Sequence, residues 1–184
     1  MAYNDTNIEK VLKKITFLWI RQSVGNSILL YFVFTIKGLF MNFTYINAST
    51  GASEKFPGKT ITHFLHTHLE EFGDTEEDIQ KCIDYVLNPN KGGQIIIGTD
   101  EENIVGIVIL NNTGMKDYIP ENILVYIAID NSQRGKGYGK KLMEKAISSV
   151  EGNIALHVEP NNPAKALYEK LGFTNKYLEM RLIK

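Results

Sequence analysis

The chain has 184 residues, which is the length of one domain and enough to bury a sizeable core. Its formal net charge of −1 gives no electrostatic reason to expect nucleic acid as a partner. A single cysteine, Cys82, excludes an intramolecular disulfide and a cysteine-based zinc site, and suits a reducing, cytoplasmic compartment.

Residues 1–40 differ from the rest in composition, with five basic and two acidic side chains. An apolar run, Ile28–Phe34, lies in a charge-free stretch between Arg21 and Lys37 that is shorter than the roughly 18 to 20 residues a helix needs to span a bilayer. We expect a helix or strand packed on the domain; membrane contact is the weaker alternative. Because the pattern from Met41 onward is complete by itself, residues 1–40 form an extension and residues 41–184 the domain.

Hydrophobic periodicity and turn residues predict the elements of the first half of the domain. Thr75 and Asp78 form a capping box that predicts a helix start. The predicted elements are a strand at Phe43–Ile46, helices at Thr60–Phe72 and Thr75–Leu87, and a hairpin of strands at Gln94–Gly98 and Ile104–Leu110.

The second half alternates strands and helices around a glycine-rich turn. A buried strand, Ile123–Ile129, leads through this turn into a helix whose inward face holds Leu142, Met143, Ala146, Ile147 and Val150. The strand–helix–strand order predicts that the next strand, Asn153–Val158, lies parallel to it. A helix that starts at Asn162-Pro163 and ends at Gly172 follows, and then a closing strand, Phe173–Ile183.

The turn Arg134-Gly135-Lys136-Gly137-Tyr138-Gly139 is suited to binding an anion. The first N–H groups of a helix have no internal partner and carry partial positive charge, and glycines let a phosphate approach the backbone. The spacing matches neither a Walker loop nor a dinucleotide fingerprint. An ordinary tight turn with solvated lysines is the alternative interpretation.

Two other features suggest site chemistry less strongly. His63 and His66 share a helical face, but His68 points elsewhere, so exposed histidines are favoured over a metal site, and no metal is predicted. Cys82 lies beside Ile83 and Val86, which favours a buried helix face over a catalytic nucleophile.

Two stretches together resemble the signatures of the GNAT superfamily of N-acetyltransferases. One is Arg-x-x-Gly-x-Gly at Arg134, Gly137 and Gly139; the other is the run from Asn161 through Ala164, Leu167 and Tyr168 to Gly172-Phe173. The resemblance covers roughly residues 41–184. It implies an α/β fold, a central mixed sheet flanked by helices, with a splay between two parallel central strands that holds acetyl-coenzyme A.

The resemblance also implies roles for individual residues. The glycine-loop amides would hold the pyrophosphate, the Ile129 backbone the pantetheine arm, and the Ile127 N–H the thioester carbonyl. One residue fewer than usual separates Val158 from Tyr168, so either Asn161 or Asn162 would contact the cofactor. The cofactor-binding residues expected by position are Ile127, Ala128, Ile129, Gln133, Arg134, Gly135, Lys136, Gly137, Tyr138, Gly139, Lys140, Asn161, Asn162, Ala164 and Tyr168.

Tyr168 occupies the position of the family's general acid, and a core tyrosine is its alternative. The general base stays open between Glu121, His157 and a water chain. The implied activity is acetyl transfer from acetyl-coenzyme A to a primary amine by direct attack in a ternary complex. The acceptor is a small molecule or a protein amine, and the chain a monomer or homodimer. A non-catalytic acyl-coenzyme A sensor of the same fold is the alternative function.

Overall fold

The computed structural model describes residues 15–24, 27–36 and 41–183, and the chain divides into two units at residues 41 and 42. In the first unit, strand β1 (Ile15–Val24) pairs antiparallel with β2 (Ser27–Ile36), from Ile15 opposite Ile36 to Val24 opposite Ser27. The apolar run Ile28–Phe34 therefore forms a strand. No helix in the described part of the chain has the length and hydropathy that crossing a bilayer requires.

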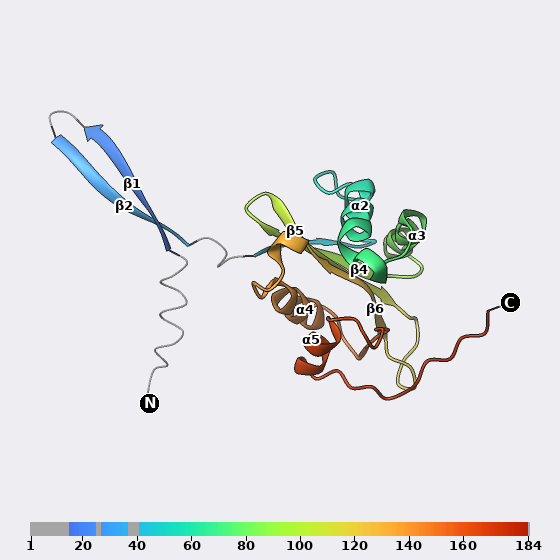
Figure 1. Cartoon of the computed structure of the whole chain (residues 1–184). Helices are drawn as coiled ribbons and strands as arrows, with labels where there is room; N and C mark the ends of the chain where they lie inside the picture. Colours follow the sequence, from blue (N-terminus) through green and yellow to red (C-terminus); the bar gives the residue numbers. More distant parts are fainter. Residues whose placement is uncertain (1–14, 25–26, 37–40, 184) are drawn as a thin grey trace. The chain divides into compact units, whose positions relative to one another are not determined.

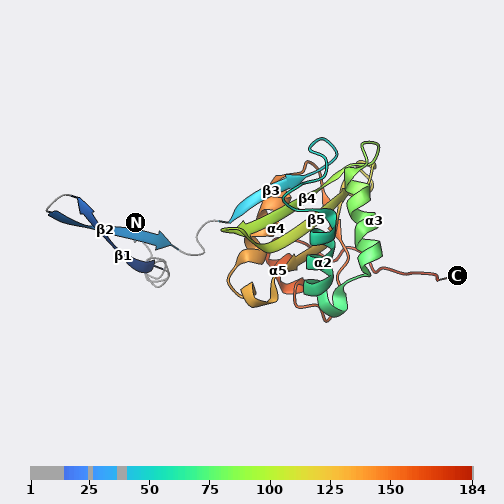
Figure 2. The ribbon, with the colours of Figure 1, turned by 90° about the horizontal axis from the view of Figure 1, so that it is seen from above.

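The second unit is built on a five-stranded sheet in the order β3-β4-β5-β6-β7 (Figures 1 and 2). Neighbouring strands are antiparallel except for β6 and β7, which are parallel as predicted. The strands are β3 (Asn42–Ile46), β4 (Gly93–Asp100), β5 (Asn103–Asn112), β6 (Asn122–Ile129) and β7 (Ile154–Leu156).

Helices cover both faces of this sheet, α2 (Gly58–Leu69) and α3 (Glu76–Leu87) on one side and α4 (Tyr138–Ser148) and α5 (Lys165–Lys170) on the other (Figure 1). The sequence explains this arrangement, because β4 and β5 are almost continuously apolar and six successive residues of each are buried. A short helical turn, η1 (Glu70–Phe72), follows α2, and a second one, η2 (Asn131–Gln133), follows β6.

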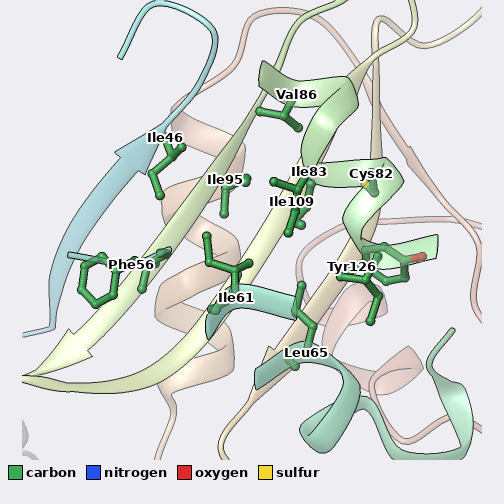
Figure 3. Packing of buried hydrophobic residues seen from close by; sticks show 14 residues of the cluster. Ile46, Phe56, Ile61, Leu65, Cys82, Ile83, Val86, Ile95, Ile109 and Tyr126 are labelled. Carbon is green, nitrogen blue, oxygen red and sulfur yellow. The ribbon is translucent and has the colours of Figure 1, made fainter. Parts of the chain in front are cut away.

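Alternate residues of the strands pack against the two helical layers. Toward α2 and α3 they form one cluster with Ile61, Leu65, Ile83 and Val86, in which Cys82 and Tyr126 also lie (Figure 3). On the other face, Leu142, Met143 and Ala146 of α4 are fully buried. Each buried Leu, Ile, Val or Met side chain contributes about 1.5–3 kcal/mol by its removal from water, so the two layers fix the sheet between them.

The predicted helix start at Thr75 is confirmed, because its hydroxyl oxygen accepts from the Asp78 N–H at 3.2 Å; the Asp78 carboxylate in turn accepts from the Thr75 hydroxyl at 2.8 Å. Other boundaries differ from the prediction. Phe72 lies in η1 rather than in the helix, and Ile147, predicted to face inward, is 37% exposed since it lies at the edge of the α4 stripe. Helix α5 begins at Lys165, after a turn in which Asn162 Oδ1 accepts from the Ala164 N–H at 2.8 Å.

The predicted closing strand is wrong for this structure, because residues 173–183 form no strand. The alternation of Leu178, Met180 and Leu182 with Glu179 and Arg181 is a strand pattern, but a strand also needs a partner edge. All three apolar side chains are more than 80% exposed. The strand predicted at Asn153–Val158 is present but shorter, because β7 covers only Ile154–Leu156.

We predict that a chain starting at Met41 folds without the first unit, because the five-stranded sheet and its helices belong wholly to residues 42–184. Thermal unfolding should stay cooperative, with a melting temperature within about 5 °C of the full chain. Aggregation, or loss of the cooperative transition, would show that residues 1–40 cover part of the core.

Candidate active site

The glycine-rich loop joins the end of β6 to the start of α4. At the start of the loop, the Asp130 carboxylate accepts hydrogen bonds from the N–H and the hydroxyl of Ser132 at 2.8 and 2.7 Å. This bonding lowers the pKa of Asp130. Gly135 and Gly137 then adopt φ values of 75° and 84°, in the left-handed region that favours glycine. Gly137 is the residue from which α4 starts.

The loop contains a row of backbone N–H groups without a backbone acceptor in the part of the chain that the structure describes. The backbone hydrogen bonds of turns and caps in the described residues include none donated by residues 135–140, and the first from α4 runs from Lys141 N to Gly137 O at 3.2 Å. A Cβ added at Gly135 or Gly137 would meet nothing within 4 Å. This free, electropositive cradle fits a pyrophosphate group.

The predicted cationic side chains surround the loop but contact other parts of the chain. Arg134 Nη1 donates to Glu70 Oε2 at 3.0 Å, and Lys140 pairs with Glu144 at 3.6 Å. Lys136 Nζ donates to Ser132 O and to Gln133 Oε1 at 3.0 and 2.8 Å. The backbone of the loop is therefore more directly available to an anion than these side chains are.

The side chain of Tyr138 is buried and bonded to the end of β4. Its side chain is only 4% exposed, and its hydroxyl donates to Asp100 Oδ2 at 2.7 Å. Burial raises the pKa of Tyr138 to about 12, and the bond to Asp100 adds to the shift. The ring anchors α4 to the end of β4, so only the backbone of this residue can serve the loop.

Next to the loop, β6 and β7 separate. Their parallel pairing ends at Leu124 opposite Leu156, so the rest of β6 has a free edge, to which no other strand of the described residues pairs. The Asp130 N–H donates to the carbonyl oxygen of Val105 on β5 at 3.1 Å. Because N–H directions alternate along a strand, those of Ile127 and Ile129 lie on the free edge. Ala128 lies in the core cluster on the α2–α3 side, with 4% exposure.

Tyr168 on α5 lies close to this end of α4. A Cβ at Gly139 would make an ordinary contact, 3.4 Å, with Leu167 Cδ2, so the α5 residue next to Tyr168 lies beside the start of α4. The Tyr168 ring is 7% exposed and packs edge-on against Phe173, with centroids 6.0 Å apart. Burial raises its pKa to about 12, and the side-chain hydrogen bonds of the described residues include none to its hydroxyl. Of the neighbouring predicted residues, Asn161 is exposed while the Asn162 side chain caps the turn before α5.

The two candidate bases lie near the ends of β6 and β7. Glu121 Oε2 accepts from the Asn153 N–H at 2.6 Å, and Oε1 accepts from the Asp117 N–H at 3.4 Å. These backbone bonds, the one from Asn153 above all, lower the pKa of Glu121 and make it a weaker proton acceptor. His157 follows β7, is largely exposed, and has Nε2 4.0 Å from Glu179 Oε1.

The other histidines have individual partners on and around α2. His63 Nδ1 lies 3.5 Å from Glu76 Oε1, His66 Nδ1 lies 3.2 Å from the Asp74 carbonyl oxygen, and His68 Nδ1 accepts from the Asn131 N–H at 3.3 Å. Within the part of the chain that the structure describes, no three His, Cys, Asp or Glu side chains are grouped to hold a metal ion.

Contacts between distant segments bring in residues that the motifs did not indicate. Glu70 and His68 bind the turn before the glycine loop, across 61 to 66 residues of sequence. The Tyr126 hydroxyl donates to Asp74 Oδ2 at 2.6 Å, and burial together with this bond raises the pKa of Tyr126. No local pattern marks such pairs, because each partner lies in an unrelated segment.

Comparison with known proteins agrees with this geometry. Residues 91–175 match the acetyltransferase (GNAT) domain family, a range that contains both signatures. A 5-NmdU N-acetyltransferase of Pseudomonas phage PaMx11 is 37% identical over 57 residues, which are 30% of this chain and 41% of that protein.

Solved structures share the fold at low sequence identity. A possible acetyltransferase from Clostridium difficile 630 matches with a TM-score of 0.55 and 21% identity over 78% of this chain and 97% of that one. The aminoglycoside N-acetyltransferase AAC(6')-Iy in complex with CoA matches with a TM-score of 0.59 and 13% identity, over 82% and 98% of the two chains. At these identities the likeness concerns the fold alone.

Cys82 lies away from the loop, on the buried face of α3. It is 8% exposed, and its sulfur lies 3.5 Å from Asn111 Nδ2. Burial raises the pKa of the thiol to about 11. A thiol of this kind is a poor nucleophile at neutral pH, because only the thiolate reacts.

We therefore predict slow alkylation of Cys82 in the folded chain. A pKa near 11 leaves about 100-fold less thiolate at pH 8 than an ordinary cysteine has, and burial slows access further. Iodoacetamide labelling followed by mass spectrometry gives a clean result, because the chain has one cysteine. Labelling as fast as in the urea-unfolded chain would contradict a buried Cys82 thiol with a raised pKa.

Proposed function

We propose that this chain, which belongs to the GNAT acetyltransferase superfamily, transfers an acetyl group from acetyl-coenzyme A directly to a primary amine. The observation that carries the proposal is the row of unpaired backbone N–H groups at residues 135–140, next to the free edge of β6. The N-acetyltransferase activity of the phage relative supports an amine as the acceptor.

The backbone of the chain would supply most of the cofactor site. The amides of residues 135–140 would bind the pyrophosphate, and Lys136 and Lys140 can turn toward it because both side chains are exposed. The free N–H group of Ile129 would bind the pantetheine arm, and that of Ile127 would bind the thioester carbonyl, where charge develops as an amine attacks. Bound acetyl-coenzyme A supplies the activated acetyl group.

Direct transfer suits this site better than an acetylated enzyme. Cys82 is the single cysteine of the chain, and it is buried in the α3 face with a raised pKa. The acceptor nitrogen then attacks by itself and must first lose its proton, since an amine with a pKa of about 10.4 is mostly protonated at pH 7. The backbone bonds that occupy Glu121 leave His157 and solvent as the better proton acceptors.

A binding module without activity is the alternative function, and Tyr168 favours the enzyme. Among the side-chain hydrogen bonds of the described residues, none involves its hydroxyl, and Leu167 beside it on α5 lies near Gly139 at the start of α4. A pKa near 12 keeps the proton on the oxygen at neutral pH. Tyr168 can therefore donate that proton to the sulfur that leaves as the carbon–sulfur bond breaks.

Replacing Gly137 tests the pyrophosphate loop. Asp and Asn have nearly the same shape and both tolerate the left-handed conformation, so Gly137→Asn is the matched control for Gly137→Asp. A negative charge about 5 Å from a phosphate costs about 3 kcal/mol at an effective dielectric constant of 20, so the Asp variant should bind CoA about 100-fold more weakly than the Asn variant. Equal affinities, with both variants folded, would remove the phosphate from this loop.

Replacing Tyr168 tests the proton donor. Tyr168→Phe keeps the ring and its contact with Phe173 and removes only the hydroxyl. General acids contribute about 10² to 10⁴ in rate, and a donor with so high a pKa belongs at the lower end, so kcat should fall about 100-fold. CoA affinity and melting temperature should change little. An unchanged kcat, measured where chemistry limits the rate, would assign Tyr168 to packing alone.

A further inference from the structure

A small network joins the end of α2 to the turn that precedes the glycine loop. Glu70 uses both carboxylate oxygens: Oε1 accepts from Asn131 Nδ2 at 2.7 Å, and Oε2 from Arg134 Nη1 at 3.0 Å. His68 adds two more acceptors, its carbonyl oxygen for Arg134 Nη2 at 2.6 Å and its ring Nδ1 for the Asn131 N–H at 3.3 Å. Four hydrogen bonds thus hold the two ends of one short turn.

The backbone of Glu70 is held in an unusual conformation. Its φ of 55° with ψ of −133° is rare for a residue with a side chain, and it occurs where α2 ends and η1 begins. Such conformations persist where the surrounding contacts fix them, and they concentrate at functional sites. The strained residue is also the one whose carboxylate holds Asn131 and Arg134.

The position of these contacts links them to the candidate site. Asn131 begins η2, Arg134 directly follows its last residue as the C-cap, and Gly135 is next in the chain. Two N–H groups of Arg134 are used within the network, so its guanidinium faces α2 in this structure. Arg134 is therefore placed as a tether for the loop, whereas the sequence motif alone indicated a ligand for the cofactor.

We propose that Glu70 is a positioning residue for the pyrophosphate loop. By holding Asn131 and Arg134, it fixes the turn that leads into the free amides of residues 135–140 before any cofactor arrives. Preorganisation of this kind raises affinity by reducing the ordering that binding would otherwise require. The inference rests on the proposed function and adds a residue far from both signatures.

The exposure of Glu70 and Arg134 distinguishes a role in positioning the loop from a role in stabilising the fold. The side chains of Glu70 and Arg134 are 42% and 45% exposed, and ion pairs at such positions contribute little to the free energy of unfolding. Removing the carboxylate should therefore leave the melting temperature almost unchanged and act on the loop. A contact that only stabilised the fold would lower the melting temperature and leave the loop unchanged.

The test compares Glu70→Gln with Glu71→Gln in the full chain. Glu71 is an exposed acid in the same turn, and its replacement removes the same charge without touching the network. Calorimetric titration with CoA should show about tenfold weaker binding for Glu70→Gln and wild-type binding for Glu71→Gln, because the amide offers N–H groups where Asn131 or Arg134 needs an acceptor. For the double variant Glu70→Gln, Arg134→Gln, the loss should be smaller than the sum of the two single losses, because the two residues share one contact.

Hydrogen–deuterium exchange without ligand provides the second measurement. Peptides covering residues 131–137 should exchange faster in Glu70→Gln than in the wild type or in Glu71→Gln. Unchanged exchange, or CoA binding by Glu70→Gln that equals or exceeds that of the wild type, would overturn the inference. Tighter binding would mean that Glu70 withholds Arg134 from the phosphate. A wild-type chain that binds no CoA would overturn the proposed function, and the exchange data would still decide whether Glu70 orders the loop.

Discussion

The structure depends on a clamp at one end of the parallel pair β6–β7. Asn122, which is 4% exposed, donates its side-chain N–H to Glu151 O at 2.7 Å and its backbone N–H to Asn153 O at 3.1 Å. The Glu121 carboxylate accepts from the Asn153 N–H alongside. After three register pairs the strands part, close to the register shift between β5 and β6. Because β6 and β7 are held together at one end and part at the other, the rest of β6 keeps an edge of backbone N–H groups that do not pair with β7.

The loop and the candidate proton donor lie at the open end of this pair. The glycine loop continues from β6 into the N-terminus of α4, and Leu167 of α5, next to Tyr168, lies beside Gly139. Binding by backbone groups needs glycines and a helix start rather than a set of charged side chains, which agrees with a net charge of only −1. The clamp also gives Glu121 a structural role that competes with proton transfer.

Local signals in the sequence predicted most of the fold, including the strand, glycine-rich turn and helix start that form the candidate loop. The Thr75–Asp78 cap, the apolar runs of β4 and β5 and the glycines at 135 and 137 each act within a few residues, so a single segment reveals them. The strand expected at residues 173–183 failed because pairing depends on a free edge elsewhere. The contact of Glu70 with Arg134 spans 64 residues and has no periodic or motif signal, so only the folded chain reveals it.

The central claim is that the free edge and loop support acetyl transfer and not binding alone. Release of the CoA thiol from acetyl-coenzyme A, measured with a panel of small primary amines and amine-bearing peptides, tests it most directly, with mass spectrometry of the acceptor as the second readout. The account predicts thiol release that requires an amine and equals the amount of acetylated product. Tight binding of acetyl-coenzyme A, with no amine in the panel raising thiol release above the rate of hydrolysis, would contradict it.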